Sequence, residues 1–353
     1  MSSKSGVCAA LVLVCSCALA QPLVIAHRGA SGYLPEHTLA AYFIAIQQGA
    51  DYVEPDLVMT KDGVLVARHE NEIGATTDVA ERPEFAARKA SKVVDGASVS
   101  GWFSEDFTIA ELKTLRARER VPRLRPGNAR FDRMFEVPTL EEILVLLRAV
   151  NDGRQGRPVG VYAETKHPSY FAGIGLAMEE PLVRTLERHG YAGRDAPVFI
   201  QSFEVANLKR LARMTPLPLV QLLDASGRPY DFIAAGDRRT YADLATPAGL
   251  AEIATYARGI GVHKSLIIPR TAQGTLAAPT RLVGAAHAAG LVVHGWTFRA
   301  ENEFLPAEFR SAADATAHGN LAAELDRFLE LGMDGFFIDQ PEIGARARKD
   351  RVR

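Results

Sequence analysis

The sequence predicts an α/β protein, a (β/α)8 TIM barrel with a small insertion after the second strand. From Pro22 onward, short β-branched runs alternate with longer helical patterns, as in a parallel sheet whose strands are joined by helices. Strands such as Val198–Ser202 are almost continuously apolar, which indicates a sheet covered on its outer face. The length of 353 residues fits either two average domains or one barrel with an insertion.

Eight runs are predicted as barrel strands: Leu23–Ala26, Tyr52–Leu57, Val159–Thr165, Val198–Ser202, Leu217–Leu223, Ile260–Lys264, Leu291–Thr297 and Gly335–Ile338. Helices are expected between them at Thr38–Gln48, Leu140–Val150, Pro181–His189, Glu204–Met214, Pro247–Ala257, Pro279–Ala289 and Asn320–Leu331. A doubly wound open sheet is the alternative. The loop after the first strand, which begins at His27, lacks the G-x-G-x-x-G spacing of a dinucleotide-binding open sheet.

The alternation stops between the second and third strands, so residues 21–353 are expected to form one domain with an insertion at about 72–136. Thr108 followed by Glu111 forms a capping box and predicts that a helix begins there.

The later part of this insertion is strongly basic. Between Arg116 and Arg133 it carries seven arginines against Glu119 and Asp132. We interpret this stretch as a solvated helix and loop surface, with contact to an anionic substrate as the alternative. The basic tail Arg346–Arg353 is expected to be a frayed end.

Residues 1–20 are typical of a secretory signal peptide. Lys4 precedes an uncharged apolar run that ends in an Ala-Leu-Ala sequence at Ala20. The run is too short to span a membrane as a helix. The protein is therefore expected to be periplasmic or secreted. The alternatives are a buried N-terminal helix and a lipoprotein acylated at Cys17.

Composition excludes several classes of protein. With 47% hydrophobic and 24% charged residues, the chain is neither disordered nor a polytopic membrane protein. The 41 basic and 42 acidic side chains create no global basic field, so no nucleic-acid partner is expected. All three cysteines lie within residues 1–20, so cleavage would leave no thiolate nucleophile or zinc–thiolate site.

Acidic residues occur at the expected carboxyl ends of neighbouring strands, where barrel enzymes place their chemistry. Glu54 and Asp56 share one strand face because their spacing is i, i+2, and the third strand adds Glu164. Three carboxylates without cysteine form an all-oxygen site that suits Mg²⁺, Ca²⁺ or Mn²⁺ better than zinc. A surface strand end or a salt bridge to Arg28 is the alternative for the first two acids.

Two histidines are candidates for acid–base chemistry. His27 follows the first strand, and His69 follows a short run reached through the Asp62-Gly63 turn. That turn predicts a hairpin which folds His69 back towards His27. A lone histidine is usually structural, but two converging on a carboxylate cluster favour proton transfer.

These motifs resemble those of glycerophosphodiester phosphodiesterases, and the exported bacterial branch in particular. The matching motifs are His27-Arg28-Gly29, Pro35-Glu36-His37-Thr38, Glu54-Pro55-Asp56, Thr60-Lys61-Asp62-Gly63 with His69-Glu70, and Glu164-Thr165-Lys166. The family usually has asparagine where this chain has His37, a residue whose charge can change with pH.

The resemblance implies a barrel that hydrolyses glycerophosphodiesters to sn-glycerol 3-phosphate and an alcohol, in glycerol and lipid metabolism. It assigns one divalent cation to Glu54, Asp56 and Glu164, Ca²⁺ being expected and Mg²⁺ the alternative. It assigns acid–base catalysis to His27 and His69. The attacking group is left open between water and the substrate's own glycerol hydroxyl.

The resemblance also assigns substrate binding to Arg28, which would grip the phosphate, with Lys166 assisting. Trp296 near the end of the seventh strand could form an apolar wall, although it could equally belong to the core. Two alternative functions remain: a phospholipase-like barrel that acts on intact lipid, and a non-catalytic surface protein that binds a ligand on the same fold.

Overall fold

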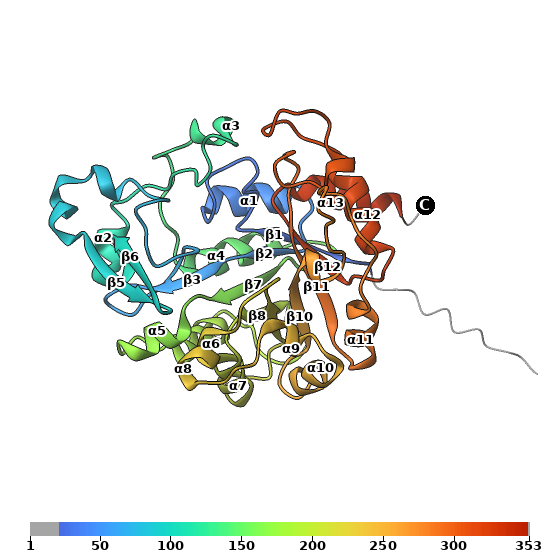
Figure 1. Ribbon diagram of the computed structural model, residues 1–353. Helices are drawn as coiled ribbons and strands as arrows, with labels where there is room; N and C mark the ends of the chain where they lie inside the picture. The colour runs from blue at the N-terminus through green and yellow to red at the C-terminus, as the bar shows by residue number, and fades with distance from the viewer. Residues whose placement is uncertain (1–20, 352–353) are drawn as a thin grey trace, which may run out of the picture.

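The predicted (β/α)8 barrel is confirmed. A computed structural model describes residues 21–351 (Figure 1). The signal-peptide and Cys17 predictions therefore fall outside the described residues. Within the described part of the chain, no helix is long and apolar enough to cross a membrane.

Eight parallel strand positions close the barrel. They are β1 (Leu23–His27), β2 (Tyr52–Glu54) continued by β3 (Asp56–Met59), β7 (Gly160–Thr165), β8 (Val198–Ser202), β9 (Leu219–Leu223), β10 (Gly259–His263), β11 (Val292–Phe298) and β12 (Gly335–Ile338). β1 pairs with both β2 and β12, and β7 pairs with β2, β3 and β8, which closes the ring. Observed and predicted strand ends agree within two residues. The second strand is divided at Pro55, which has no N–H to give to the sheet.

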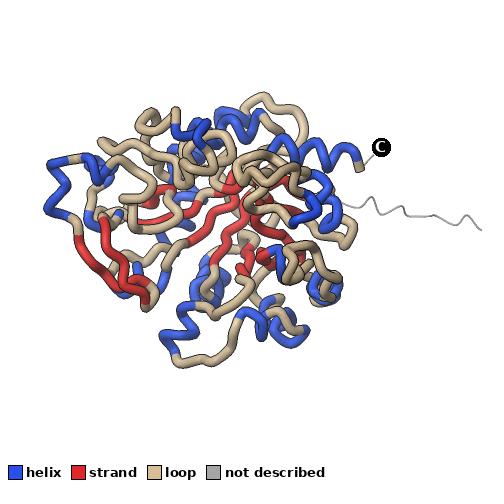
Figure 2. Tube along the Cα trace, turned by 45° about the horizontal axis from the view of Figure 1, so that its top comes forward, coloured by secondary structure: helices blue, strands red, loops and turns tan. Residues whose placement is uncertain are grey.

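Helices surround the strands (Figure 2). They are α1 (Leu39–Gln47), α4 (Leu140–Asn151), α5 (Pro168–Gly173), α6 (Glu179–Arg188), α7 (Val205–Met214), α8 (Tyr230–Ala235), α9 (Tyr241–Leu244), α10 (Pro247–Ile253), α11 (Leu282–Ala288), α12 (Leu321–Leu329) and α13 (Pro341–Asp350), with 3-10 turns at Lys264–Leu266 and Ala307–Phe309. Each predicted helix is present. α5, α8 and α9 are short helices that the hydrophobic pattern does not predict.

The expectation of a frayed basic tail is wrong as far as Asp350. α13 continues to that residue and buries Ala345 and Ala347. Arg348 binds the carboxylate of Asp51, and it donates a hydrogen bond to the Pro22 carbonyl oxygen at 3.1 Å. These contacts hold the C-terminal helix against the start of the barrel.

Alternation along the strands decides which side chains enter the barrel. The interior is filled largely by aromatic and aliphatic side chains, among them Tyr52, Tyr162 and Phe337. Glu54 lies two residues beyond Tyr52, and Glu164 lies two residues beyond Tyr162. Because strand side chains repeat every second residue, these carboxylates lie on the inner face, above the aromatic layer.

Residues 72–136, called the insertion below, contribute no strand to the barrel. They form the hairpin β5 (Ala90–Val94) and β6 (Ala97–Gly101), helices α2 (Ile109–Leu112) and α3 (Pro126–Ala129), and 3-10 turns at Val79–Glu81, Pro83–Arg88 and Ser104–Asp106. Most of the insertion lies to one side of the barrel (Figure 1). The predicted capping box of Thr108 and Glu111 is present. The β5–β6 hairpin was not predicted.

Candidate active site

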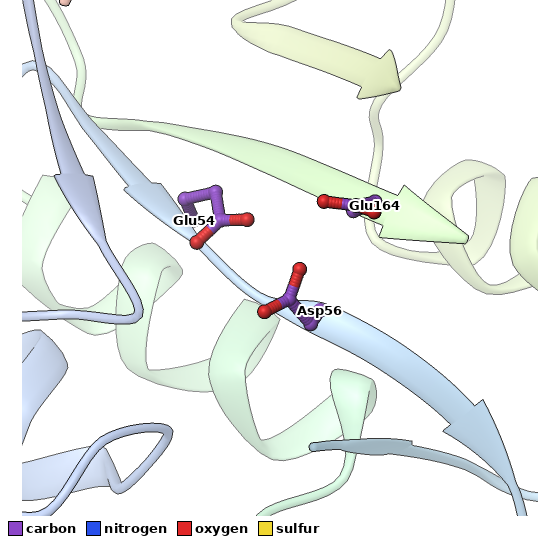
Figure 3. A group of neighbouring side chains, drawn as sticks. All are labelled: Glu54, Asp56 and Glu164. Carbon is purple, nitrogen blue, oxygen red and sulfur yellow. The ribbon is translucent and has the colours of Figure 1, made fainter. Parts of the chain in front are cut away.

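Three carboxylates converge where β2 ends, β3 begins and β7 nears its carboxyl end (Figure 3). One oxygen from each of Glu54, Asp56 and Glu164 lies within 4.8 Å of the other two. All three residues are at most 5% exposed. The predicted acidic cluster therefore forms, and its members come from strands that the sequence separates by more than 100 residues.

Hydrogen bonds fix the orientation of two of these acids. Glu54 accepts from the backbone N–H of Arg28 at 2.8 Å and from the Gln201 amide at 3.1 Å. Asp56 Oδ2 lies 2.9 Å from His37 Nε2. The other Asp56 oxygen, Oδ1, and Oε1 of Glu164 are buried, and each is paired only with the Lys166 ammonium, at 3.3 and 2.5 Å.

The negative charges of the three carboxylates repel one another, and this repulsion, together with burial and the nearby Lys166 ammonium, shifts their pKa values. Burial raises the pKa of Glu54 well above its usual value, and the negative charges of Asp56 and Glu164 add to the effect. Burial and Asp56 likewise raise the pKa of Glu164 to about 8, against the Lys166 ammonium. Burial also works to raise the pKa of Asp56, but the charge of Lys166 and the hydrogen bond from His37 outweigh it and hold that pKa well below its usual range.

The donor set fits a hard divalent cation. Three buried carboxylates repel one another unless a positive charge lies among them. Oxygen ligands without thiolate or imidazole suit Ca²⁺ or Mg²⁺. The observation in this structure that supports such a ligand is the convergence of three buried carboxylate oxygens within 4.8 Å of one another.

His37 lies behind the cluster and supports Asp56. It is fully buried, with Nε2 towards Asp56 and Nδ1 2.8 Å from the Tyr42 hydroxyl. Burial lowers its pKa, so the ring is neutral. Because the carboxylate only accepts, Nε2 carries the proton and Nδ1 accepts from Tyr42. The backbone φ of His37 is 54°, a left-handed conformation in which asparagine and histidine are both enriched.

His27 is oriented by a carboxylate from the opposite end of the chain. Its Nδ1 lies 2.7 Å from Oδ1 of Asp339, the residue directly after β12. Burial and the charge of Arg28 lower the pKa of His27 to about 4 despite this partner. The ring is therefore neutral near pH 7, with the proton on Nδ1. Nε2 is left as the basic nitrogen.

His69 has a matching arrangement. β3 and β4 (Leu65–Ala67) form the predicted antiparallel hairpin, and His69 follows it. Its Nδ1 lies 2.5 Å from Oε1 of Glu70. Burial and the cations Arg28 and Lys166 lower its pKa to about 3. His69 is thus also neutral, with Nε2 available.

Arg28 and Lys166 supply positive charge beside the cluster. Arg28 donates to Glu36 at 2.9 Å, and its Nε lies 3.3 Å from Asp56. The Lys166 ammonium lies 2.5 Å from Glu164 and 3.3 Å from Asp56. Burial would lower the pKa of both cations, but the surrounding carboxylates outweigh it and raise both pKa values.

One cavity of about 630 Å³ joins all eight predicted site residues. These are His27, Arg28, Glu54, Asp56, His69, Glu164, Lys166 and Trp296. Trp296 lies towards β10, where the edge of its ring meets His263 at 4.9 Å and Phe203 at 5.8 Å between ring centres. The cavity therefore has a charged end at the acidic cluster and an aromatic wall at β8, β10 and β11.

Other polar residues at or near the cavity were not predicted as site residues. Asp339, the carboxylate partner of His27, had a usable signal, because it directly follows the predicted strand Gly335–Ile338. Asp224 follows β9, His263 is the last residue of β10, and both line the cavity. His294, expected to be a packing residue, is 1% exposed and bonds the Tyr162 hydroxyl at 2.8 Å inside the barrel.

Fold and cavity together define a class: a barrel hydrolase with an acidic cluster and two neutral histidines, flanked by cations suited to a phosphate. The model of the glycerophosphoryl diester phosphodiesterase family matches residues 27–343. The chain belongs to this family, and it is an enzyme that hydrolyses glycerophosphodiesters.

Two named relatives support the assignment to this family. A glycerophosphodiester phosphodiesterase of Arabidopsis thaliana is 37% identical over 333 residues, covering 90% of this chain and 84% of the relative. One from Bacillus subtilis is 30% identical over 332 residues, with coverages of 93% and 86%.

Solved structures support the fold. A phosphodiesterase of Oleispira antarctica, in complex with its product sn-glycerol-3-phosphate, is 22% identical, has a TM-score of 0.61, and is matched over 93% of this chain and 97% of that one. A glycerophosphodiester phosphodiesterase of Agrobacterium tumefaciens is 18% identical, has a TM-score of 0.56, and is matched over 92% and 99%.

Proposed function

We propose that this enzyme releases sn-glycerol 3-phosphate and an alcohol from glycerophosphodiesters, using a carboxylate-bound divalent cation and two histidines. One observation carries the proposal. The three acids within 4.8 Å of one another and both neutral histidines line the same cavity. The product bound to the Oleispira antarctica protein supports the same product here.

Glu54, Asp56 and Glu164 would hold the cation, with Ca²⁺ expected and Mg²⁺ as the alternative. When bound, the cation neutralises charge on the phosphodiester and helps to orient phosphorus for in-line attack. Arg28 and Lys166 lie beside the cluster, where they would bind non-bridging phosphate oxygens. Trp296 and Phe203 would shield the glycerol or alcohol group from water.

His27 and His69 would move the protons. The histidine that acts as the base accepts a proton at Nε2 from the attacking hydroxyl. The other must first take up a proton at its own Nε2, becoming an imidazolium that its carboxylate partner stabilises, and then donates that proton to the departing alkoxide. Asp339 and Glu70 hold each ring with its Nδ1 protonated, so that Nε2 faces the reaction. Each such proton transfer contributes about 10²–10⁴-fold to the rate.

A coupled assay for glycerol 3-phosphate tests the proposal. The rates on glycerophosphocholine and glycerophosphoethanolamine are measured with EDTA and after addition of Ca²⁺ or Mg²⁺. Choline release then compares glycerophosphocholine with a diacyl phosphatidylcholine, because cleavage of the intact lipid yields no glycerol 3-phosphate. Release from the water-soluble diesters should be lost in EDTA and restored by one cation. Faster turnover of the diacyl lipid, or full activity in EDTA, would contradict the proposal.

Two variants test the histidines. His27→Ala and His69→Ala should each lose turnover by about 10²-fold or more, while calorimetry shows nearly unchanged cation binding. ³¹P NMR of the wild-type reaction distinguishes a cyclic phosphate intermediate from direct attack by water. A variant with near-normal kcat would remove that histidine from the role.

We also propose that the chain is exported, as periplasmic or secreted protein. The support is the signal-like sequence of residues 1–20, which contains all three cysteines. The mass of the protein from a secreting host measures the processed N-terminus. Cleavage after Ala20 is expected, whereas a lipid-modified mass beginning at Cys17 would identify a lipoprotein.

A further inference from the structure

Two of the arginines in the insertion reach back to the active site. Arg125 is 8% exposed, and the Arg120 side chain is 27% exposed. Their neighbour Arg118 binds Glu81, another residue of the insertion, at 2.9 Å. The interpretation of the basic stretch as a solvated surface is therefore wrong for these two residues, which contact carboxylates of the active site.

Arg120 grips the carboxylate that orients His69. Its guanidinium donates to both oxygens of Glu70, at 2.7 and 3.0 Å. It also donates to both oxygens of Glu36, at 2.7 and 2.8 Å. Oε1 of Glu70 is the atom that meets His69 Nδ1, so a continuous chain of hydrogen bonds runs from Arg120 to the imidazole.

Arg125 does the same for the other histidine. Its Nη2 donates to Oδ2 of Asp339 at 2.6 Å, while Oδ1 of that carboxylate meets His27. Two further contacts fix the guanidinium, to Glu301 at 2.6 Å and to the Ser31 carbonyl oxygen at 2.8 Å. Such contacts from three directions leave the Arg125 side chain little freedom to move.

We infer that Arg120 and Arg125 are positioning residues through which the insertion orients both proposed catalytic histidines. This inference rests on the proposed function, because it takes His27 and His69 as the proton-transfer pair. A carboxylate held by an arginine stays ionised and in place, so it fixes the tautomer and orientation of the ring it bonds.

The carboxylates that the two arginines bind differ in whether the barrel supplies a second cation to them. Asp339 also receives a hydrogen bond at 2.9 Å from Arg299, which follows β11. Among the described residues, Glu70 has ion pairs only with His69 and Arg120. Loss of Arg120 should therefore disturb its histidine more than loss of Arg125 disturbs the other.

The experiment compares Arg120→Ala, Arg120→Lys, Arg125→Ala and Arg125→Lys with Arg118→Ala as the matched control. We expect kcat on glycerophosphocholine to fall about 10–100-fold for Arg120→Ala and about tenfold for Arg125→Ala. KM should change less than kcat, and calorimetric Ca²⁺ affinity should stay near wild type. Each lysine variant should recover part of the loss, because lysine keeps the charge without the fork of donors. Arg118→Ala should retain wild-type kcat.

A double-mutant cycle separates positioning from a general structural role. If Arg120 acts through Glu70, then Glu70→Gln combined with Arg120→Ala should lose no more activity than Glu70→Gln alone. Additive losses, an equal loss in Arg118→Ala, or wild-type kcat in folded Arg120→Ala and Arg120→Lys would each overturn the inference. His27→Ala and His69→Ala are assayed beside them. If these stay active, the proposed function fails, whereas if only the arginine variants stay active, the positioning inference alone fails.

Discussion

Replacing Asp339 by asparagine should reverse the tautomer of His27 without disturbing the acidic cluster. Oδ2 of Asp339 accepts from Arg125 at 2.6 Å and from Arg299 at 2.9 Å, and Oδ1 meets Nδ1 of His27. An asparagine offers one acceptor oxygen and one NH₂ group. Two guanidinium donors require the oxygen, so the NH₂ group must face His27.

That orientation has a definite chemical result. The NH₂ group donates to Nδ1, which must then be unprotonated, and the ring proton moves to Nε2. A ring protonated at Nε2 when neutral cannot accept the proton of an attacking hydroxyl, which is the step that this prediction assigns to His27. The same carboxylate-to-amide change in the Ser-His-Asp triad lowers kcat by about 10⁴-fold, so we expect a loss of about 10³–10⁴-fold, or roughly 4–5.5 kcal/mol of activation free energy.

The assay is glycerol 3-phosphate release at saturating substrate, with Ca²⁺ affinity and thermal unfolding measured on the same samples. Asp237→Asn is the control, because Asp237 binds Arg239 at 2.8 Å away from the cavity. Asp339→Asn should bind Ca²⁺ normally, be folded at the assay temperature and turn over very slowly. A kcat within tenfold of wild type would refute the reasoning about the tautomer.

Three further predictions concern binding and stability. Glu54→Gln and Glu164→Gln should each weaken Ca²⁺ binding by about a hundredfold in calorimetry; wild-type affinity would exclude that ligand. His37→Asn should keep the left-handed backbone, with φ 54°, but lower the free energy of unfolding by about 1–3 kcal/mol in denaturant titration, because Tyr42 loses its acceptor; an unchanged midpoint would count against that hydrogen bond. Burial raises the pKa of Glu204 to about 7 from 4.5, so the folded state holds this proton more tightly, and stability should fall as pH rises from about 4.5 to 7, by roughly 3 kcal/mol at most. Glu204→Gln should flatten this slope in melts at several pH values, and an unchanged slope would assign it to other groups.

Strand periodicity made much of the site predictable. Once Tyr52–Leu57 is taken as a strand, the i, i+2 spacing of Glu54 and Asp56 puts both carboxylates on one face. Glu164 joins them because parallel strands of a barrel end at the same rim. Asp339 follows a predicted strand in the same way, but no second acid beside it in the sequence drew attention to it.

The contacts that Arg120 and Arg125 make with carboxylates near the site could not be predicted from the local sequence pattern. Arg120 meets Glu36 across 84 positions of sequence, and Arg125 meets Asp339 across 214. Neither arginine lies in a regular element whose period would set its direction. Only the path of the insertion decides that these two turn inward while Arg118 stays within the insertion. Hydrophobic pattern carries no information about such a path.

The negative charge of the site explains why one pair of cations, Arg28 and Lys166, lies beside the acidic cluster while a second pair, Arg120 and Arg125, binds the carboxylates that orient the histidines. Glu70 and Asp339 must stay ionised at a site that already holds three buried carboxylates, which requires positive charge nearby. Arg28 and Lys166 could provide it only by turning away from the position proposed for the phosphate. Arg120 and Arg125 approach from the insertion and bind the carboxylates instead. The insertion therefore supplies charge that the barrel rim could not give without weakening its proposed grip on the substrate.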